Sequence, residues 1–432
     1  MTLTYHIWTI GCQMNEADSR HLASRLESVG CTPAERADEA DLLILNTCVV
    51  RQQAEDKIYS RLLFTESLKR KKKGLIVALM GCLVGKKETE ALRQRFPFID
   101  VFMSPSEISP LLDFIQGAKA PSAEEDLLQD YNLPAPEKGQ TIATHVPVVL
   151  GCSHACSYCV IPYQRGPEKS RPSEDILEEI LRLAQQGVRE VTLLGQIVDR
   201  YGLDFKNGAS LAGLLRQTAA VEGISRVRFL TSHPNWMNDE ILEAVLADAR
   251  ICPHFEVPFQ AGSDEVLKRM RRGYTLADYQ RLIDRIRQKI PHAGISADVI
   301  VGFCGETETQ YLETVRLVEE IQPDMLRIAK YSSRPQTHAA RHLPDDVPED
   351  EKERRRVHLE KVLREQLDKR HRLLAGSIVQ ILVEALEKEG RWRGRTPQNK
   401  VVFCDDERDL LGQLVDVKLE WTQPFSMGGK AV

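Results

Sequence analysis

The stretch VVLGCSHACSYCVIPYQR, residues 148–165, places three cysteines directly after an apolar run. Cys152, Cys156 and Cys159 are separated by three residues and then by two. So short a segment can bring three thiolates to one metal centre, whereas disulfide pairing would leave one cysteine over. The simplest alternative is a zinc site with His154 as fourth ligand. His154 is only two positions from each flanking cysteine, however, which is a cramped spacing for tetrahedral coordination.

The whole chain has the composition of a soluble globular protein. Its 432 residues predict two to four domains, and 42% of them are hydrophobic and 28% charged. No run of 18 apolar residues is present, and the N-terminus lacks a basic region followed by an apolar core, so we expect neither a membrane span nor a secretory signal. Ten cysteines without such a signal predict a reducing, cytoplasmic location, with thiols that bind metal or lie buried.

The charge of the chain says little about its partners. A net charge of −5 argues weakly against nucleic acid, but binding needs only a local basic surface. Basic residues concentrate at 69–73 and 352–372. Either segment by itself is typical of a solvated helix face.

The first 118 residues repeat a strand and a helix three times. We expect strands at 5–9, 42–45 and 76–80 and helices at 16–29, 51–70 and 86–96, which together predict a parallel α/β domain. Cys12, Cys48 and Cys82 each follow one of these strands. Because parallel strands end at one edge of the sheet, this pattern predicts a second site with three thiols. The alternative is that they are ordinary core cysteines, which is how we interpret Cys31.

After an acidic, proline-bearing linker at 119–140, the alternation resumes for six units over 141–372. The expected strands are 146–150, 190–194, 227–230, 254–257, 295–301 and 325–329, which predict a six-unit (β/α) partial barrel. Functional groups in such a fold gather at the carboxyl ends of the strands. His233 alone would be an ordinary loop histidine. Together, the polar groups after these strands ring one mouth and suit a polar cofactor, and the candidates are Tyr158, Gln196, Ser232, Gln260, Ser263, Gly302, Glu306 and Arg334.

The C-terminal end changes its period from helix to strand. Residues 348–372 are charged and compatible with a helix, whereas 378–384, 400–403 and 414–420 are strand-like and predict a small β-barrel over 373–432. This part resembles the TRAM domain, an RNA-binding module. We expect Trp392, Arg393 and Arg395 to form a basic tip with an aromatic ring that contacts RNA.

The Cys-x3-Cys-x2-Cys spacing with Tyr158 before the last cysteine resembles the radical S-adenosylmethionine enzymes. The resemblance implies that Cys152, Cys156 and Cys159 hold a 4Fe–4S cluster whose open iron binds S-adenosylmethionine. The words GCQMN (11–15), LNTC (45–48) and GC (81–82) look like the N-terminal domain of methylthiotransferases, which implies an auxiliary 4Fe–4S cluster on Cys12, Cys48 and Cys82.

Further words are similar to the branch of that family that acts on isopentenylated tRNA: CVIPYQRGPEKSRP (159–172), LLGQ (193–196), TSHP (231–234), VPFQAGSD (257–264), VGFCGET (301–307) and SSRPQT (332–337). Four residues depart from its pattern. Ile197 and Asp199 stand where asparagines are usual, Cys304 replaces a proline and Gln336 replaces a glycine. These departures concern substrate contacts, and we interpret Cys304 and Cys252 as non-ligands.

The resemblance implies an enzyme that adds a methylthio group to carbon 2 of N(6)-isopentenyladenosine next to the anticodon of tRNA. We expect a monomer, although the sequence does not reveal the oligomeric state. The enzyme would use a radical derived from S-adenosylmethionine, sulfur from the auxiliary cluster and a one-electron reductant of the flavodoxin or ferredoxin type. The sulfur donor stays open. The alternatives are the same chemistry on threonylcarbamoyl-adenosine or on a ribosomal-protein aspartate, a non-catalytic iron–sulfur electron carrier, and a zinc-dependent RNA-binding protein.

Overall fold

The computed structural model describes residues 3–48, 52–84, 89–117 and 141–432. The expected linker at 119–140 lies outside these ranges. The chain divides into two units, described separately below. The first comprises Met1–Ala135, Leu150–Ala155 and Cys159–Glu179, and the second comprises Pro136–Val149, Cys156–Tyr158 and Ile180–Val432.

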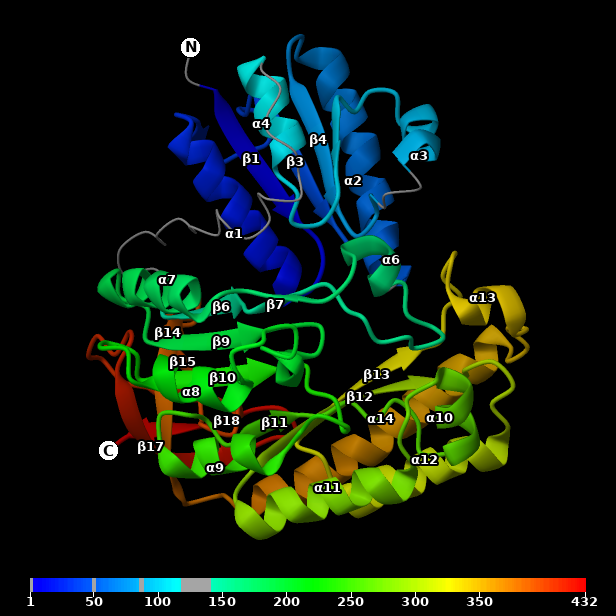
Figure 1. Cartoon of the computed structure of the whole chain (residues 1–432). Coiled ribbons are helices and arrows are strands. Elements are labelled where there is room, and N and C mark those ends of the chain that lie inside the picture. The colour runs from blue at the N-terminus through cyan, green and yellow to red at the C-terminus, as the bar shows by residue number, and fades with distance from the viewer. Residues whose placement is uncertain (1–2, 49–51, 85–88, 118–140) are drawn as a thin grey trace. The chain divides into compact units, whose positions relative to one another are not determined.

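A five-stranded parallel sheet forms the centre of the first unit (Figure 1). Its strands are β1 (Thr4–Thr9), β2 (Thr32–Pro33), β3 (Leu42–Thr47), β4 (Ile76–Gly81) and β5 (Val101–Met103), in the order β2-β1-β3-β4-β5. The three predicted strands are confirmed, and two short strands extend the sheet at its edges. Order and direction follow the doubly wound plan, in which ligands bind at the carboxyl ends of the strands.

Helices cover both faces of this sheet. They are α1 (Gln13–Ser28), α2 (Gln52–Lys71), α3 (Thr89–Arg95) and α4 (Ser109–Gln116). Successive residues of a strand point to opposite faces, and β3 is fully buried. Leu42 and Ile44 therefore pack with α1 and α4, whereas Leu43 and Leu45 pack with α2 and α3. The basic run at the end of α2 is largely neutralised within the unit, since Lys69 pairs with Asp100, Arg70 with Glu66 and Lys72 with Asp41.

The second unit is built on six parallel strands. They are β6 (Ala143–Pro147), β9 (Glu190–Leu194), β10 (Arg226–Leu230), β11 (His254–Glu256), β12 (Gly294–Val301) and β13 (Met325–Lys330). They form the sheets β6-β9-β10 and β11-β12-β13. A bridge from Val227 to Ile251 and a hydrogen bond from the Ser232 amide to the Glu256 carbonyl (3.0 Å) join β10 to β11. The predicted six-unit parallel core is confirmed, with the first expected strand divided into β6 and β7 (Val149–Leu150).

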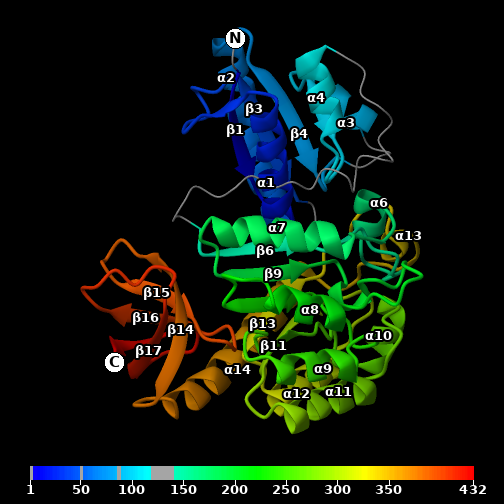
Figure 2. The ribbon, with the colours of Figure 1, turned by 60° about the vertical axis from the view of Figure 1, so that its left-hand side comes forward.

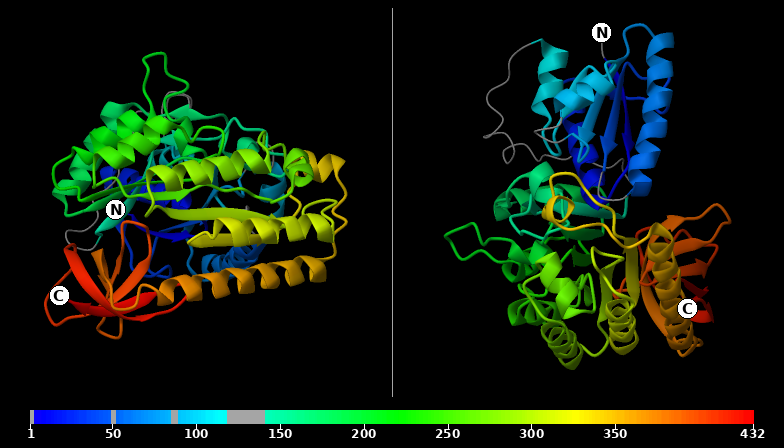
Figure 3. Two further views of the ribbon diagram at one scale, coloured as in Figure 1. Left: turned by 90° about the horizontal axis from the view of Figure 1, so that it is seen from below. Right: turned by 90° about the vertical axis from the view of Figure 1, so that its right-hand side faces the viewer.

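Helices follow these strands in alternation, as predicted. They are α7 (Ser173–Gln185), η1 (Val198–Arg200), α8 (Leu211–Ala219), α9 (Asp239–Ala247), α10 (Asp264–Met270), α11 (Leu276–Lys289), α12 (Glu308–Ile321), α13 (His338–His342) and α14 (Glu349–Arg372). The helix α6 (Ile161–Arg165) and the short strand β8 (Lys169–Ser170) come before α7 in the chain and belong to the first unit. Thr275 and Thr307 begin α11 and α12 with capping boxes. The long helix α14 lies along β13 and α12 (Figure 3), with Leu359, Leu363 and Leu367 as its buried stripe.

A closed β-barrel follows α14 directly (Figure 2). Its strands are β14 (Ile378–Leu386), β15 (Trp392–Arg395), β16 (Val401–Asp405), β17 (Leu414–Thr422) and β18 (Met427–Ala431), in the order β14-β15-β16-β18-β17. Val415, Val417 and Leu419 alternate into its core, as their period of two predicts. The C-terminal β-barrel is therefore confirmed.

The expected basic tip of the barrel is wrong. Trp392 is only 8% exposed, packs in the barrel core and donates its indole N–H to the Asp406 carbonyl (3.2 Å). The Arg395 guanidinium pairs with Glu384 at 2.5 Å and with the buried Glu190 at 2.7 Å, and Arg393 pairs with Glu387 at 2.6 Å. Strand alternation turns Trp392 into the barrel core, and both arginines form ion pairs within the protein, so the three side chains do not form a tip with an exposed aromatic ring.

The described residues contain no helix that is long and apolar enough to cross a membrane.

Candidate functional site

Three cysteines of the first unit follow three adjacent parallel strands. Cys12 is the residue before α1, Cys48 comes directly after β3, and Cys82 comes directly after β4. Pairing of β1 with β3 and of β3 with β4 sets these positions at the same edge. The three cysteines therefore follow neighbouring strands at one edge of the sheet.

Two buried asparagines hold the turns that carry these cysteines. The Asn15 side-chain amide donates to Asn46 Oδ1 (2.9 Å) and to the Thr47 carbonyl (3.0 Å), while Asn46 donates back to the Asn15 carbonyl (2.7 Å). The Cys12 thiol donates to Asn15 Oδ1 at 3.3 Å. The asparagines of GCQMN and LNTC therefore tie the first cysteine turn to the second.

A glycine before Cys82 allows the third turn to approach the second. Gly81 has a φ of +97°, and a Cβ there would lie 2.3 Å from the Thr47 carbonyl oxygen. The Cys82 amide donates to that same oxygen at 2.8 Å. No other residue fits this close, left-handed turn without moving the cysteine.

A buried ion pair faces this cysteine group. The Arg165 guanidinium lies 2.8 Å from the Asp18 carboxylate, and the two side chains are 4% and 0% exposed. The positive charge of Arg165 also acts on the Cys82 thiol. The pKa of Cys82 is raised to about 11, because burial outweighs the opposing charge of Arg165 and the charges of Cys48 and Cys12 add to the rise. Three thiols beside a buried cation form a donor set that suits an anionic iron–sulfur cluster.

The 151–165 loop is anchored separately in each unit. In the first unit, the Cys152 amide donates to the Gly166 carbonyl (3.1 Å), and a Cβ on Gly151 would lie 2.1 Å from the Pro167 carbonyl oxygen. The loop therefore needs glycine directly before its first cysteine.

In the second unit, Cys156–Tyr158 is fastened to the end of α10. Ser157 donates its amide to the Met270 carbonyl (3.0 Å) and its hydroxyl to the Arg269 carbonyl (2.7 Å). Arg272 Nη1 donates to the Cys156 thiol at 3.2 Å, and this arginine is 5% exposed. The Tyr158 ring makes an edge contact with Phe303, with ring centroids 6.3 Å apart.

The chemistry of the six predicted ligands fits iron–sulfur binding. None of the ten cysteines, all of which lie in the described ranges, forms a disulfide. No three His, Cys, Asp or Glu side chains within those ranges stand close enough to share one metal ion. A 4Fe–4S cluster binds its thiolates at different irons, so its ligands need not converge on a single point.

The candidate cofactor residues of the second unit lie along the carboxyl edge of the six strands. Gln196 follows β9, Ser232 follows β10, Gln260 and Ser263 follow β11, Gly302 and Glu306 follow β12, and Arg334 follows β13. Ser232 Oγ is buried, and no described residue hydrogen-bonds it, so this hydroxyl suits a polar ligand. Thr231 and Gln260 have φ values of +68° and +67°, a strained conformation that is typical of functional edges.

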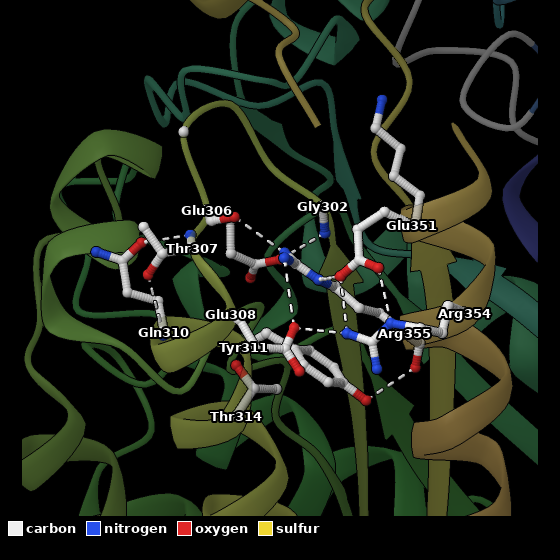
Figure 4. Close-up of polar contacts among 12 residues, drawn as sticks. Gly302, Glu306, Thr307, Glu308, Gln310, Tyr311, Thr314, Glu351, Arg354 and Arg355 are labelled. Carbon is white, nitrogen blue, oxygen red and sulfur yellow. Dashed lines mark hydrogen bonds and ion pairs between the residues drawn. The ribbon is translucent and has the colours of Figure 1, made fainter. Parts of the chain in front are cut away.

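Glu306 is already engaged within the protein, as Figure 4 shows. Its carboxylate accepts the Gly302 amide at 2.6 Å and pairs with Arg355 of α14 at 2.8 Å. Burial raises the pKa of Glu306, and the bonds from Gly302 and Arg355 oppose that rise. A Cβ on Gly302 would lie 2.3 Å from Lys352 Cγ. Gly302 and Glu306 therefore hold the loop after β12 against α14. Their contact with a cofactor stays a prediction.

The structure shows the surroundings of the four residues that depart from the family pattern. The Asp199 carboxylate accepts the His233 amide at 3.0 and 3.2 Å, which fixes the turn after β10. Gln336 has a φ of +70°, which explains why glycine is usual at this position. Cys304 and Ile197 are buried, at 2% and 6% exposure.

Sequence reasoning missed the two arginines that contact thiols. Arg165 stands inside the quoted 148–165 stretch, and Arg272 stands in RRGY (271–274), so both were visible. Their role could not be predicted, because the cysteine beside each arginine is far from it in the sequence and only the tertiary structure brings the two together.

Comparison with known proteins covers the whole chain. Residues 146–318 match the radical SAM superfamily, residues 4–104 match the uncharacterized protein family UPF0004, and residues 372–432 match the TRAM domain. The tRNA-2-methylthio-N(6)-dimethylallyladenosine synthase of Herpetosiphon aurantiacus is 41% identical over 431 residues, covering 99% of this chain and 97% of the relative. The synthase of the same name from Roseiflexus sp. is 43% identical over 428 residues, covering 98% and 89%.

Solved structures share the fold. The radical S-adenosylmethionine methyltransferase TsrM from Kitasatospora setae, with cobalamin and a [4Fe-4S] cluster bound, aligns with a TM-score of 0.60 at 16% identity, over 79% of this chain and 77% of its own. The cobalamin-dependent S-adenosylmethionine radical enzyme OxsB aligns with a TM-score of 0.52 at 11% identity, over 83% and 56%. Near full-length identity above 40% is decisive, and the chain belongs to the tRNA-2-methylthio-N(6)-dimethylallyladenosine synthase family.

Proposed function

We propose that this chain adds a methylthio group to carbon 2 of N(6)-isopentenyladenosine next to the anticodon of tRNA. The observation that carries the proposal is the identity of 41% over 99% of the chain to a relative whose name states this product. The three cysteines that follow β1, β3 and β4 support it, because an auxiliary thiol site distinguishes sulfur transfer from simpler radical chemistry.

The reaction needs more than side-chain acids and bases, because the C–H bond at carbon 2 of an adenine is strong and unactivated. When bound, S-adenosylmethionine and the iron–sulfur clusters supply the radical that breaks this bond and the sulfur that replaces the hydrogen. Cys152, Cys156 and Cys159 would hold one 4Fe–4S cluster, and Cys12, Cys48 and Cys82 would hold the other. Each trio leaves one iron without a cysteine, where a further ligand can bind.

The remaining candidate residues would bind and orient the cofactor and keep water away from it. Ser232 offers a buried hydroxyl to a polar ligand, and Gln260 lies in a strained turn at the same edge. Arg272 donates a hydrogen bond to Cys156, and the charge of Arg165 acts on Cys82. Such second-layer donors orient ligands and tune the centre that they hold.

The outer face of the barrel offers a surface for unpaired bases. The Phe403 and Trp421 rings are stacked with centroids 6.3 Å apart and planes 19° apart, and the Arg391 guanidinium lies 5.4 Å from the Phe403 centroid. Gly428 makes room for Trp421, since a Cβ there would lie 2.4 Å from the indole. Stacking on aromatic rings beside a cation suits single-stranded RNA. We assign to this platform the RNA contact that Trp392 cannot make.

The test is turnover by anaerobically reconstituted protein with S-adenosylmethionine and a chemical or flavodoxin reductant. The substrates are isopentenylated tRNA, threonylcarbamoyl-adenosine tRNA and ribosomal protein, and mass spectrometry detects the added methylthio group. Product on the isopentenylated tRNA alone supports the proposal. Product on another acceptor reassigns the substrate, and cluster-loaded protein without product on any acceptor overturns the function.

The platform is tested by measuring the affinity of the protein for the same isopentenylated tRNA. Trp421→Ala should weaken tRNA binding by roughly 10-fold, within the usual range for one stacked base. Phe425→Ala, which removes a 46% exposed ring of the same barrel outside the platform, is the matched control and should change binding little. Equal losses in both variants would contradict the assignment.

A further inference from the structure

Each cysteine trio has one buried arginine directed at one of its thiols. In the first unit the charge of Arg165 acts on Cys82, and in the second unit Arg272 Nη1 lies 3.2 Å from the Cys156 sulfur. The Arg165 side chain is 4% exposed and Arg272 is 5% exposed. A guanidinium does not lose its proton in a protein, so both carry a permanent positive charge.

The two arginines differ in their counter-charge. Arg165 is paired at 2.8 Å with the fully buried Asp18 carboxylate, which also accepts the Ser106 hydroxyl at 2.7 Å. The pair is therefore close to neutral as seen from the cysteines beside it.

Arg272 has no such partner. Besides Cys156 it donates to the Tyr274 hydroxyl (3.2 Å) and to the Pro258 carbonyl (3.3 Å), both of which are neutral. Across the described ranges, no carboxylate forms an ion pair with Arg272. A buried charge without a counter-charge is strongly unfavourable, and among the hydrogen-bond partners of Arg272 the Cys156 sulfur is the one that a cluster ligand would provide.

The consequence concerns the electron that the centre must accept. Reduction adds a negative charge to an iron–sulfur cluster, and a nearby positive charge in a poorly screened interior favours the reduced form. An uncompensated guanidinium on a ligand sulfur raises the reduction potential, whereas a neutral arginine–aspartate pair has much less effect.

We propose that Arg272 is a positioning residue that raises the reduction potential of the centre on Cys152, Cys156 and Cys159, and that Asp18 cancels the corresponding effect of Arg165 on the centre of Cys12, Cys48 and Cys82. This inference rests on the proposed function, since it assumes that the trios hold iron–sulfur clusters.

The test uses the full-length chain with one trio at a time. Cys12, Cys48 and Cys82 are replaced by alanine, the remaining cluster is reconstituted, and its potential is measured by a redox titration followed by electron paramagnetic resonance. Into this background go Arg272→Gln, which removes the charge, and Arg272→Lys, which keeps it. We expect a more negative potential for Arg272→Gln and a potential near that of the parent for Arg272→Lys.

The complementary chain carries alanine at Cys152, Cys156 and Cys159. There the paired replacement of Arg165 by Gln and Asp18 by Asn removes both charges together, and we expect a shift smaller than that of Arg272→Gln. Equal shifts at the two centres overturn the asymmetry, and equal potentials for Arg272→Gln and Arg272→Lys overturn the role of charge.

Failure of the cluster to assemble is also informative. If Arg272→Gln does not load iron and sulfide, loading of Arg272→Lys supports a need for the charge, and failure of both variants overturns it. If the parent with one intact trio holds no cluster, the proposed function fails rather than the assignment of Arg272.

Discussion

The two cysteine trios are assembled in opposite ways. Cys152, Cys156 and Cys159 come from one short loop, so their proximity is written into the spacing of the chain. Cys12, Cys48 and Cys82 are brought together only by the register of β1, β3 and β4. The surroundings differ too, since one trio faces an arginine with a carboxylate partner and the other faces an arginine with neutral partners.

The two trios also need different structural support. The sheet-borne trio needs two buried asparagines and the left-handed Gly81 to hold three distant turns at one edge. The loop trio needs anchors for one segment, which Gly151 and Ser157 provide. A site assembled over a long chain distance depends on the fold of its unit, whereas a site in one loop depends on a few local bonds.

The largest effect should come from removing one thiol of each trio. Cys156→Ala and Cys82→Ala should both reduce methylthio transfer below detection, because each removes a ligand of a required cluster. Only Cys156→Ala should also abolish cleavage of S-adenosylmethionine. Mass spectrometry of tRNA nucleosides and of 5′-deoxyadenosine measures both outcomes.

Cys31→Ala is the matched control, because Cys31 is a buried core residue of the first unit outside either trio. It should retain both activities. Loss of S-adenosylmethionine cleavage in Cys82→Ala would contradict the division of labour between the trios.

The next effect tests the ion pair beside the sheet-borne trio. Asp18→Asn leaves the Arg165 guanidinium buried without its counter-charge, which should cost about 3–5 kcal/mol of unfolding free energy. Denaturant unfolding together with amide exchange along α1 measures the loss. Asp38→Asn is the control in the same unit, because the Arg36–Asp38 pair is solvent-exposed, and it should produce no measurable change. Similar losses for both variants would show that burial of the pair is unimportant.

A smaller effect should appear with pH and should act on both units. Burial lowers the pKa of His21 to about 3 in the first unit and that of His254 to about 3 in the second. Between about pH 6.5, the ordinary histidine pKa, and about pH 3, these histidines are protonated in the unfolded chain and neutral in the folded chain. The free energy of unfolding therefore falls as the pH falls. The expected slope is about 1.4 kcal/mol per pH unit for each histidine, and above pH 6.5 the full stability is present.

Thermal unfolding between pH 7.5 and 5 measures this slope. His254→Asn should reduce the slope of the second unit and leave that of the first unchanged. An unchanged slope in both units would exclude His254 as its source.

The smallest effect concerns the loop after β13. Gln336→Gly removes a left-handed side-chain conformation that costs about 1–2 kcal/mol, but it adds about 0.5–1 kcal/mol of chain entropy to the unfolded state. The net gain should stay below about 1 kcal/mol and raise the melting temperature slightly. Gln217→Gly, in the regular helix α8, should instead destabilise the second unit by about 1 kcal/mol. Destabilisation by both substitutions would show that Gln336 contributes contacts that outweigh its strain.

Much of the fold was predictable because hydrophobic period and strand ends are local properties. The run 42–45 became β3 and 190–194 became β9, since continuous apolar segments between helices form buried parallel strands. The expected RNA tip at Trp392 was wrong because its role depends on which face of β15 turns inward and on carboxylates far away in sequence.

The sequence by itself determined the six candidate thiols, the alternation of strands and helices, and the edge at which polar side chains gather, because spacing and periodicity are carried by neighbouring residues. Only the tertiary structure decided which charges lie beside those thiols. Asp18 and Arg165 are 147 residues apart, and Cys156 and Arg272 are 116 apart. Contacts over such separations are set by packing, and no local pattern of residue types encodes which buried arginine finds a carboxylate and which finds a thiol alone.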